Sequence, residues 1–459
     1  MKLTTALQGA HYTFADLKDL FAKANEEKSG DQLAGLAARS SQERIAAKWL
    51  LSEITLSDIR NNPLIPPEQD EVSRLIEEAV DESVYRQWAG TTVSGLREWL
   101  VHPETNSKDI LHISKGLTSE MIAAVAKIMS NLDLIHVSGK INAITSCRTA
   151  IGHKGTLASR LQPNHPSDDP DGVRAVMYEG LSFGVGDALI GINPVIDTFE
   201  SVKRLFDVMN EVVEKEGIPT QCSVLSHITT QMKVAEAGTA CDLFFQSLAG
   251  TEAGNKSFGI SVAMMDEAYE LAKAHSRRGR TYGPNRMYFE TGQGSELSAE
   301  AHHGVDQLTL ESRCYGMARR YNPFLLNTVT GFMGPEYTFS GKQIIRNALE
   351  DVFMGKMHGL TMGADVCYTS HIASDQNDME NLGVLLTAAG VQYLIAIPMG
   401  DDCMLNYQSL SFQDIASLRQ TLGKKPGHDF ARWLSARGLF HEGRPSERAG
   451  DLRVLVGGR

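Results

Sequence analysis

The sequence lacks the features that mark secreted, disulfide-bonded and membrane-spanning proteins. Its six cysteines lie far apart with no C-x-x-C pair, which argues against a disulfide framework and against a zinc site. No apolar run approaches the roughly 20 residues needed to span a bilayer. The stretch from Met1 to Phe14 has no apolar core behind a basic start, so we expect no secretory signal. Together these absences predict a cytoplasmic protein with reduced thiols.

The chain is also poor in positive charge. Its 459 residues include 44 Lys and Arg against 56 Asp and Glu, which gives a net charge of −12. A basic face supplies most of the affinity of proteins for nucleic acid and for anionic membranes. We therefore expect neither as a partner. The content of 42% hydrophobic and 22% charged residues is ordinary for a chain with a packed core.

Several catalytic and metal-binding signatures are missing as well. The sequence has no H-E-x-x-H motif, no P-loop and no nucleophile elbow. Asp375, Asn377 and Asp378 begin like a calcium loop, but Glu380 and Leu386 occupy its sixth and twelfth positions, which excludes that site. The basic cluster at 277–280 fits a phosphate site or, as we favour, a solvated helix end.

Residues 1–150 are predicted to form a mostly helical region. Ser40 followed by Glu43 predicts a capping box at the start of one helix. Ile45 and Trp49 share a face of that helix and are expected to lie in the core. Apolar spacing and capping residues predict further helices over 14–29, over 70–85 and from Thr118 to Ile128.

From about residue 150 the pattern changes to short β-rich runs that alternate with helical stretches. The expected strands are Thr156–Leu161, Ala188–Ile192, Cys222–Leu225, Leu243–Ser247, Arg286–Phe289, Phe324–Val329, Leu360–Val366 and Tyr393–Pro398. The clearest expected helices are Thr198–Lys215 and Phe258–His275. About eight strand–helix units in about 250 residues match the size of one closed parallel barrel.

The sequence thus predicts an α/β protein with a (β/α)8 TIM barrel over residues 151–405. A helical N-terminal extension precedes the barrel, and a short helical C-terminal tail follows over 406–459. The continuous apolar runs suit strands that are covered on both faces. A doubly wound open sheet is the alternative, but no glycine-rich phosphate fingerprint follows the first strand.

Polar side chains stand where nearly every expected strand ends. They are Arg160, Gln162, Asn193, His227, Gln246, Glu290, Asn327, Asp365, Asp401 and Asp402. Barrel enzymes build their sites at the carboxyl ends of the strands, so these side chains are expected to converge. One Arg, several amides and carboxylates suit a small ligand that carries both a positive charge and a hydroxyl. No strand end offers a lysine, so a Schiff-base nucleophile is not evident.

Glu290 is the sharpest single candidate in this set. It follows the apolar run Met287–Phe289 and precedes Thr291–Ser295, in which two glycines permit a ligand to approach the backbone closely. Asp365 ends a similar stretch. If both carboxylates share one mouth, their repulsion raises one pKa, and a bound ammonium relieves that cost.

Several long stretches at and between these strand ends are also familiar. They are Ala158–Asn164, Tyr178–Asp187, Gly191–Val195, Tyr288–Ser295, Gly334–Tyr337 and Gly400–Asp402, with Lys23–Glu26 and Ser57–Pro63 nearer the N-terminus. Over nearly its whole length the chain resembles the large subunit of ethanolamine ammonia-lyase. The resemblance implies a TIM barrel that converts 2-aminoethanol to acetaldehyde and ammonia with adenosylcobalamin, in a hetero-oligomer with a small subunit.

The resemblance also implies roles for particular residues at the substrate. Arg160 and Asn193 match positions that hold the substrate hydroxyl. Gln162, Glu290 and Asp365 match positions that hold its ammonium. His227 and Asn327 stand at strand ends but receive no role from the resemblance.

A second set of positions matches residues that contact the cofactor. Pro194, Gln246, Ser298 and Met404 are implied to contact cobalamin, Phe258 is implied to line the pocket, and no protein side chain is implied as a metal ligand. The histidine-on motif D-x-H-x-x-G is absent, so we expect the cofactor to keep its own nucleotide base on cobalt. The radical belongs to the cofactor, which explains why no protein nucleophile is needed.

Two other functions are weighed beside this one. A barrel lyase without a cofactor predicts turnover in the absence of cobalamin. A non-catalytic subunit that keeps the fold predicts loss of the site residues, yet all five substrate positions named above are present. The sequence does not distinguish an enzyme free in the cytoplasm from one enclosed in a bacterial microcompartment.

Overall fold

The computed structural model describes residues 3–275 and 282–456, so the basic cluster at 277–280 lies outside the described residues. Eight parallel strands form one sheet in the order β7-β6-β5-β12-β11-β10-β9-β8. They are β5 (Ala158–Leu161), β6 (Leu189–Ile192), β7 (Cys222–Val224), β8 (Phe244–Ser247), β9 (Met287–Thr291), β10 (Leu325–Val329), β11 (Met362–Asp365) and β12 (Tyr393–Ala396). Each overlaps one of the eight predicted strands.

The strand order shows that this sheet is a barrel. The first strand, β5, pairs with the last strand, β12, with Ala158 opposite Tyr393. At the remaining seam, between β7 and β8, the N–H of Leu243 donates to the carbonyl of Cys222 at 3.3 Å. In a doubly wound open sheet the last strand lies at an edge. The predicted (β/α)8 barrel is therefore confirmed and the open sheet is excluded.

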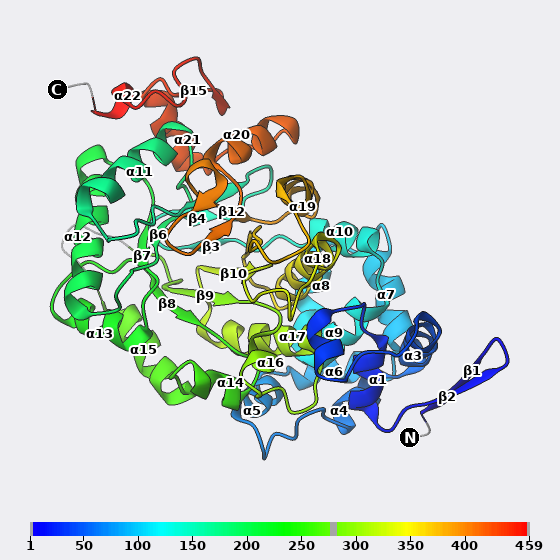
Figure 1. Cartoon of the computed structure of the whole chain (residues 1–459). Coiled ribbons are helices and arrows are strands. Elements are labelled where there is room, and N and C mark those ends of the chain that lie inside the picture. The colour runs from blue at the N-terminus through cyan, green and yellow to red at the C-terminus, as the bar shows by residue number, and fades with distance from the viewer. Residues whose placement is uncertain (1–2, 276–281, 457–459) are drawn as a thin grey trace.

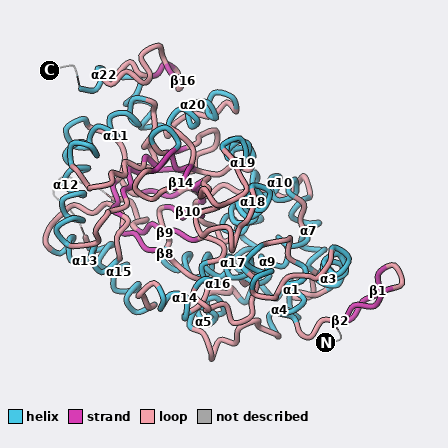
Figure 2. The backbone as a smooth tube through the Cα atoms, in the orientation of Figure 1, coloured by secondary structure: helices cyan, strands magenta, loops and turns pink. Residues whose placement is uncertain are grey.

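Helices connect the strands and surround the barrel (Figures 1 and 2). They are α11 (Pro170–Ser182), α12 (Phe199–Glu216), α13 (Ile228–Glu236), α14 (Glu252–Ser257), α15 (Val262–Ala274), α16 (Ser295–Ser298), α17 (Gln307–Ala318), η2 (Arg319–Tyr321), α18 (Gly341–Met357), α19 (Gln376–Ala388) and α20 (Phe412–Thr421). The prediction of one helix over Phe258–His275 is wrong at its start. Gly259 has a φ of 76°, which ends α14 and lets Ser261 cap a new helix, α15.

The N-terminal part of the chain is helical, as predicted, but begins with a hairpin that projects from the body (Figure 1). Its elements are β1 (Thr4–Leu7), β2 (Ala10–Thr13), α1 (Leu17–Ala24), α2 (Ser29–Leu33), α3 (Ser41–Glu53), α4 (Leu56–Asn61), α5 (Glu71–Glu78), α6 (Glu82–Trp88), α7 (Val93–Val101), α8 (Ser107–Ile113), η1 (Ser114–Gly116), α9 (Ser119–Ile128) and α10 (Asn131–Lys140). These helices pack beside α17 and α18 on one flank of the barrel. The helix expected over 14–29 is α1, which already ends at Ala24. The helix expected over 70–85 is divided into two shorter ones, α5 and α6. Across the described ranges, no helix is long and apolar enough to cross a membrane.

The capping box predicted at α3 is only half formed. The hydroxyl of Ser40 accepts from the N–H of Glu43 at 3.1 Å, but the Glu43 carboxylate accepts from the N–H of Arg39 instead of Ser40. The prediction that Ile45 and Trp49 lie in the core is wrong, because they are 53% and 64% exposed. Small alanines on the opposite face of α3 let it pack closely against α1.

The amino end of the barrel is plugged by a short hairpin of β3 (Thr145–Ser146) and β4 (Ala150–Ile151). The hydroxyl of Thr145 donates to the carbonyl of Phe324 at 2.5 Å. Above the plug, Tyr288 and Tyr393 fill the barrel interior with aliphatic side chains from the other strands. A Cβ atom on Gly363 would lie 2.2 Å from the Tyr393 ring, so glycine makes room for it. Because the plug and these side chains fill the rest of the barrel interior, the carboxyl end is left for polar side chains.

The chain finishes in short elements next to the barrel. They are η3 (Pro398–Gly400), β13 (Asp401–Asp402), β14 (Tyr407–Gln408), α21 (His428–Ala436), β15 (Phe440–His441), β16 (Arg444–Pro445) and α22 (Arg453–Val456). The β13–β14 hairpin follows the last barrel strand and pairs Asp402 with Tyr407. It therefore brings side chains from beyond residue 400 to the mouth of the barrel.

Candidate active site

A buried arginine organises the carboxyl end of the barrel. Arg160 lies on β5, is 1% exposed and donates from Nη1 to the Tyr288 hydroxyl and to Glu290 Oε1, both at 2.5 Å. Its Nη2 donates to Gln162 Oε1 at 2.7 Å and to the Gly191 carbonyl at 3.4 Å. Among the described residues its Nε has no hydrogen-bond partner. The guanidinium thus joins β5, β6 and β9.

One oxygen of Glu290 is fixed and the other is unoccupied. Oε1 accepts from Arg160, from the Tyr288 hydroxyl and from Asn327 Nδ2, the last at 3.5 Å. No side chain in the described part of the chain donates to Oε2. Burial raises the pKa of Tyr288 well above its usual value, so its hydroxyl remains a donor. Glu290 is held in place by one oxygen and has the other for a cation.

Gln162 connects this arginine to the hairpin that follows the last strand. Its Nε2 donates to Asp402 Oδ2 at 2.9 Å and to the Tyr407 hydroxyl at 2.7 Å. The Tyr407 hydroxyl in turn donates to Asp365 Oδ2 at 2.9 Å. Arg160, Gln162 and Asp365 therefore belong to one hydrogen-bonded network, although Asp365 lies on β11, far along the chain from the other two.

Asp365, at the end of β11, is a buried carboxyl with a perturbed acidity. Burial raises its pKa to about 6, while hydrogen bonds from Ser409 and Tyr407 and the charge of Arg160 act in the opposite direction. The Ser409 hydroxyl donates to Oδ1 at 2.7 Å. A bound cation favours the ionised form, as expected from the sequence for a carboxylate at a shared mouth.

Asn193 reaches the network through Asn164. Asn164 Nδ2 donates to Asp402 Oδ2 at 2.7 Å, and its Oδ1 accepts from the backbone N–H of Asn193 at 2.8 Å. Asn193 and Gly191 are two apart on one extended segment, so they face the same side. All five predicted substrate residues are thus brought together at the carboxyl end of the barrel.

A cleft of about 390 Å³ opens beside this network. Its lining residues come from the ends of β7, β8, β9 and β10 and are mostly apolar; they include Phe245, Gln246, Phe258, Glu290, Val329 and Met333. Among these lining residues, Glu290 is the one with a carboxylate side chain. The network and the cleft therefore meet at Glu290, with polar groups on one side of it and an apolar wall on the other.

The four positions implied to contact a cofactor lie around the same mouth, with different surroundings. Gln246 lines the cleft and uses Oε1 to accept from the N–H of Ile228 at 3.0 Å. The N–H of Met404 donates to Asp402, and Pro194 follows Asn193. Ser298, at the end of α16, is exposed, and its hydroxyl donates to the carbonyl of Ser295. Of these four, Met404 bonds to the network, Gln246 lines the cleft, and Ser298 does neither.

His227 and Asn327, which had no role from the resemblance, also stand at the mouth. His227 caps α13, lines the cleft and bonds through Nδ1 to the Thr229 hydroxyl at 2.8 Å. Asn327 supports Glu290 with Nδ2, and its Oδ1 has no partner in the described ranges. Each is explained by a structural contact.

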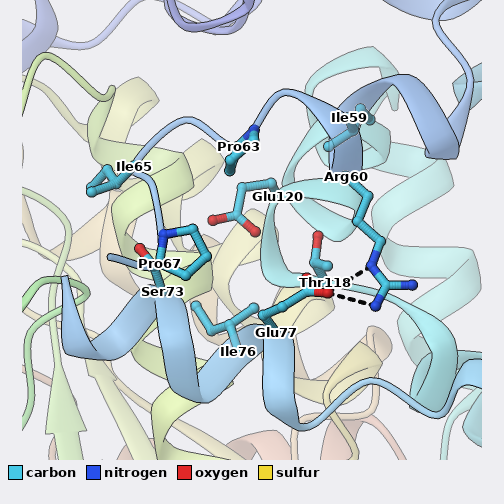
Figure 3. A pocket seen from close by; sticks show the side chains of 10 residues that line it. All are labelled: Ile59, Arg60, Pro63, Ile65, Pro67, Ser73, Ile76, Glu77, Thr118 and Glu120. Atoms are coloured by element: carbon cyan, nitrogen blue, oxygen red, sulfur yellow. Dashed lines mark hydrogen bonds and ion pairs between the residues drawn. The ribbon is translucent and has the colours of Figure 1, made fainter. Parts of the chain in front are cut away.

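A second hollow lies among the N-terminal helices and is a poor candidate for a site (Figure 3). Its volume is about 30 Å³, close to the space that one water molecule occupies. Arg60 pairs there with Glu77 at 2.5 Å, and Glu120 pairs with Arg313 at 2.5 Å. Its charges are already neutralised by one another, so the barrel mouth is the candidate active site.

The sequence missed several polar residues of the network, among them Tyr288, Asn164 and Tyr407. Tyr288 lies two residues before Glu290, so strand periodicity places it on the same face and was a usable signal. Asn164 lies within a stretch that was singled out, but its contacts were not predictable. Tyr407 lies in a hairpin beyond the last strand, and nothing local marks it. Asp401, predicted at a strand end, is exposed and accepts from Gln408 Nε2 at 3.1 Å, outside the network.

Among the residues that the structure describes, no group of three or more His, Cys, Asp or Glu side chains is placed to hold a metal ion.

The family model described as "Ethanolamine ammonia lyase large subunit (EutB)" matches residues 12–448. The chain is 52% identical over 451 residues to the proteins named "Ethanolamine ammonia-lyase large subunit" of Escherichia coli (strain K12) and of Salmonella typhimurium (strain LT2). Both alignments cover 98% of this chain and 99% of the relative.

Likeness to solved structures is weaker. A truncated 3-deoxy-D-arabino-heptulosonate 7-phosphate synthase from Thermotoga maritima aligns with a TM-score of 0.36 and 13% identity, over 61% of this chain and 92% of that chain. That score is too low to support an argument. The sequence match, in contrast, covers nearly the whole of both chains, and the strand-end residues on which it depends are assembled into one site. The chain belongs to the family of ethanolamine ammonia-lyase large subunits.

Proposed function

We propose that this chain is the catalytic subunit of a lyase that converts ethanolamine to acetaldehyde and ammonia with the help of adenosylcobalamin. The observation that carries the proposal is the placement of Glu290. One of its oxygens is fixed by the Arg160 network, while the residue itself lines the cleft. The names of the relatives from Escherichia coli and Salmonella support the same substrate.

The polar groups of the network suit the two ends of a small amino alcohol. The ammonium of ethanolamine would lie against Glu290, Asp365 and Gln162 Oε1, where two carboxyls and an amide oxygen accept hydrogen bonds. The hydroxyl would lie between Arg160 and Asn193. Gripping both ends fixes the carbon atoms between them, which lowers the entropic part of the barrier.

The cleft and its rim suit a large, mostly apolar cofactor. Gln246, Phe258 and Met333 line the cleft, and Pro194 and Met404 stand on the rim; with Ser298 they would hold the cobalamin. When bound, adenosylcobalamin supplies the radical that abstracts hydrogen from C1 of the substrate.

The part left to the protein is to bind, orient and protect. Arg160 and its partners hold the substrate in one pose, and the apolar lining of the cleft keeps water from reactive species. Glu290 holds the ammonium and, as a carboxylate, can take a proton from the amine as it migrates from C2 to C1. Within the described network, no lysine or thiol stands ready to act as a nucleophile.

A partner subunit fits the surface around the mouth. Val195, Ile196, Phe332 and Met399 follow strands β6, β10 and β12, and between 41% and 77% of each is exposed. Large apolar side chains gathered at one end of a barrel favour a covered surface. We propose that the small subunit covers it in a hetero-oligomer, in the cytoplasm or within a microcompartment.

The cofactor requirement is tested by turnover. We expect the purified chain with its small subunit to release acetaldehyde from ethanolamine with adenosylcobalamin, and to release none with cyanocobalamin or without cofactor. Turnover that ignores the cofactor would support a cofactor-free lyase and contradict the radical mechanism. No acetaldehyde under any condition, from an assembled complex, would contradict the proposed substrate.

The pH dependence of substrate binding is a second test. Asp365 has a pKa of about 6, while the amine of ethanolamine stays protonated throughout this range. Below about pH 6 the carboxyl is neutral, so affinity should fall by up to about tenfold for each further pH unit. Calorimetry between pH 5 and pH 8, on the full chain with its small subunit and no cofactor, measures this.

Asp365→Asn is the matched variant for the pH test. It should bind ethanolamine more weakly at pH 7 and show no change in affinity between pH 5 and pH 7. Stability responds with the opposite sign, because a folded pKa above the unfolded value of 3.8 stabilises the fold most at low pH. That contribution is lost as pH rises through 6. An affinity that stays constant in the unsubstituted protein would refute the assignment.

A further inference from the structure

Asp402 has hydrogen bonds on both oxygens and is 3% exposed. Oδ1 accepts from the backbone N–H groups of Met404 at 3.0 Å and Leu405 at 2.8 Å. Oδ2 accepts from Gln162 Nε2 at 2.9 Å and Asn164 Nδ2 at 2.7 Å. An ionised carboxylate accepts hydrogen bonds and donates none. Asp402 therefore determines which end of each amide faces it.

The first consequence concerns Gln162. Its two N–H bonds are used by Asp402 and by the Tyr407 hydroxyl, and Tyr407 uses its own proton on Asp365. The amide oxygen must therefore point away from Asp402, toward Arg160. An amide oxygen has two acceptor sites, so one remains for a donor on a ligand.

The second consequence passes through Asn164 to Asn193. Because Asn164 turns its NH2 toward Asp402, its oxygen accepts from the backbone N–H of Asn193 at 2.8 Å and from Asn193 Nδ2 at 3.5 Å. The side-chain oxygen of Asn193 is then turned away from Asn164. It is available as an acceptor, whereas the Arg160 guanidinium is only a donor.

We propose that Asp402 is a positioning residue that fixes the polarity of the site, so that both ends of the bound ligand must donate hydrogen bonds. The ammonium donates to Gln162 Oε1. The hydroxyl accepts from Arg160 and must donate its own proton to Asn193 Oδ1. The site thereby selects a 2-amino alcohol with a free O–H over an amine of the same size without that donor. This inference rests on the proposed function, since it takes ethanolamine as the ligand.

The variant Asp402→Asn opposes this polarity with little change of shape. The new amide keeps its oxygen on the two backbone N–H groups and turns its NH2 toward Gln162 and Asn164. Gln162 is then left between this NH2 and Arg160, and Asn164 between it and the backbone N–H of Asn193. If Gln162 turns its own NH2 away from the new amide, it presents N–H to the ammonium. We expect ethanolamine affinity to fall by at least about tenfold, because buried groups are left facing like partners.

The decisive readout is the choice between ethanolamine and 2-fluoroethylamine, which lacks the O–H donor but matches its size. Calorimetry on the full chain with its small subunit, without cofactor, gives both affinities. We expect the unsubstituted protein to prefer ethanolamine by about tenfold or more, and Asp402→Asn to reduce the preference to within about threefold. Asp401→Asn, which removes a neighbouring exposed carboxylate, should keep the original preference.

A second variant tests the same inference if Asp402→Asn does not fold, as judged by its melting temperature. Asn164→Ala removes the connection to Asn193 and leaves the contact between Asp402 and Gln162. It should lose the preference for the O–H donor because ethanolamine affinity falls by about tenfold, while the affinity for 2-fluoroethylamine changes by less than about threefold. A purely structural role would weaken both amines equally and leave the preference intact.

The outcomes separate the inference from the proposed function. If the unsubstituted protein binds ethanolamine but shows no preference, or if a folded Asp402→Asn or Asn164→Ala variant keeps the preference, the role of Asp402 is refuted and the proposed function stands. If the assembled, unsubstituted protein does not bind ethanolamine, the proposed substrate fails and the inference fails with it. Loss of preference in both variants, with the Asp401→Asn control unchanged, establishes the inference.

Discussion

Replacing Glu290 by glutamine is expected to lower kcat for acetaldehyde release by at least about 100-fold. Among the described residues, the carboxylate is the one side chain that joins the Arg160 network to the cleft. An amide of the same shape removes the negative charge that we propose holds the ammonium. It also removes the partner of a buried guanidinium, which is costly because the remaining charge stays uncompensated. The variant should nevertheless bind adenosylcobalamin within about threefold of the original affinity, since a glutamine of the same shape leaves the side chains implied to contact the cofactor in place.

The control for this variant is Glu296→Gln, six residues further along. Glu296 is 1% exposed and accepts from the N–H of Gly250. Burial raises its pKa, so a neutral amide is a mild change at that position. It should keep normal turnover. Steady-state kinetics and a spectroscopic cobalamin titration measure both variants, and normal turnover in Glu290→Gln would remove this residue from the site.

Replacing Arg160 by lysine should reduce kcat/KM for ethanolamine by at least about 100-fold, although the charge is kept. The guanidinium donates simultaneously to four partners: Tyr288, Glu290, Gln162 and the Gly191 carbonyl. A lysine ammonium is a point charge on a flexible stem and cannot span them. Each buried acceptor that loses its donor costs about 1–3 kcal/mol, and two such losses correspond to about 100-fold.

Arg174→Lys is the matched control for this substitution. Arg174 lies on α11, outside the barrel, and pairs with Asp171 and Glu211 at partly exposed positions. Exposed pairs of this kind contribute little, so the control should keep its kinetics and melting temperature. If a folded Arg160→Lys variant retains most of its kcat/KM, the site does not require the planar guanidinium with its several N–H donors.

The fold was predictable because its signals are local. A strand covered on both faces is a short run of apolar residues, and each of the eight runs that the sequence offers became a barrel strand. The closure of the sheet into a barrel has no such local signal, because it depends on the pairing of β5 with β12 across some 230 residues of chain. Where local signals conflicted with packing, packing decided: Trp49 is exposed because the small residues on the other face of α3 pack more closely.

The site was predictable in part for the same reason. Side chains such as Arg160, Glu290 and Asp365 stand directly at strand ends, and a barrel brings all strand ends to one mouth. Tyr288 shares a strand face with Glu290 and could have been found by its spacing. Tyr407 could not, because it arrives from a hairpin beyond the barrel and contacts Gln162 and Asp365 only in three dimensions.

The sequence has no paired cysteines, little positive charge and no long apolar runs. By itself it nevertheless determined the set of strands, the polar residues that end these strands, and the family that the chain resembles. The tertiary structure alone decided which of those residues share hydrogen bonds and in which direction each bond runs. The reason is physical. A residue type fixes which atoms can donate or accept, but an amide such as Gln162 can present either end until a carboxylate such as Asp402 packs against it.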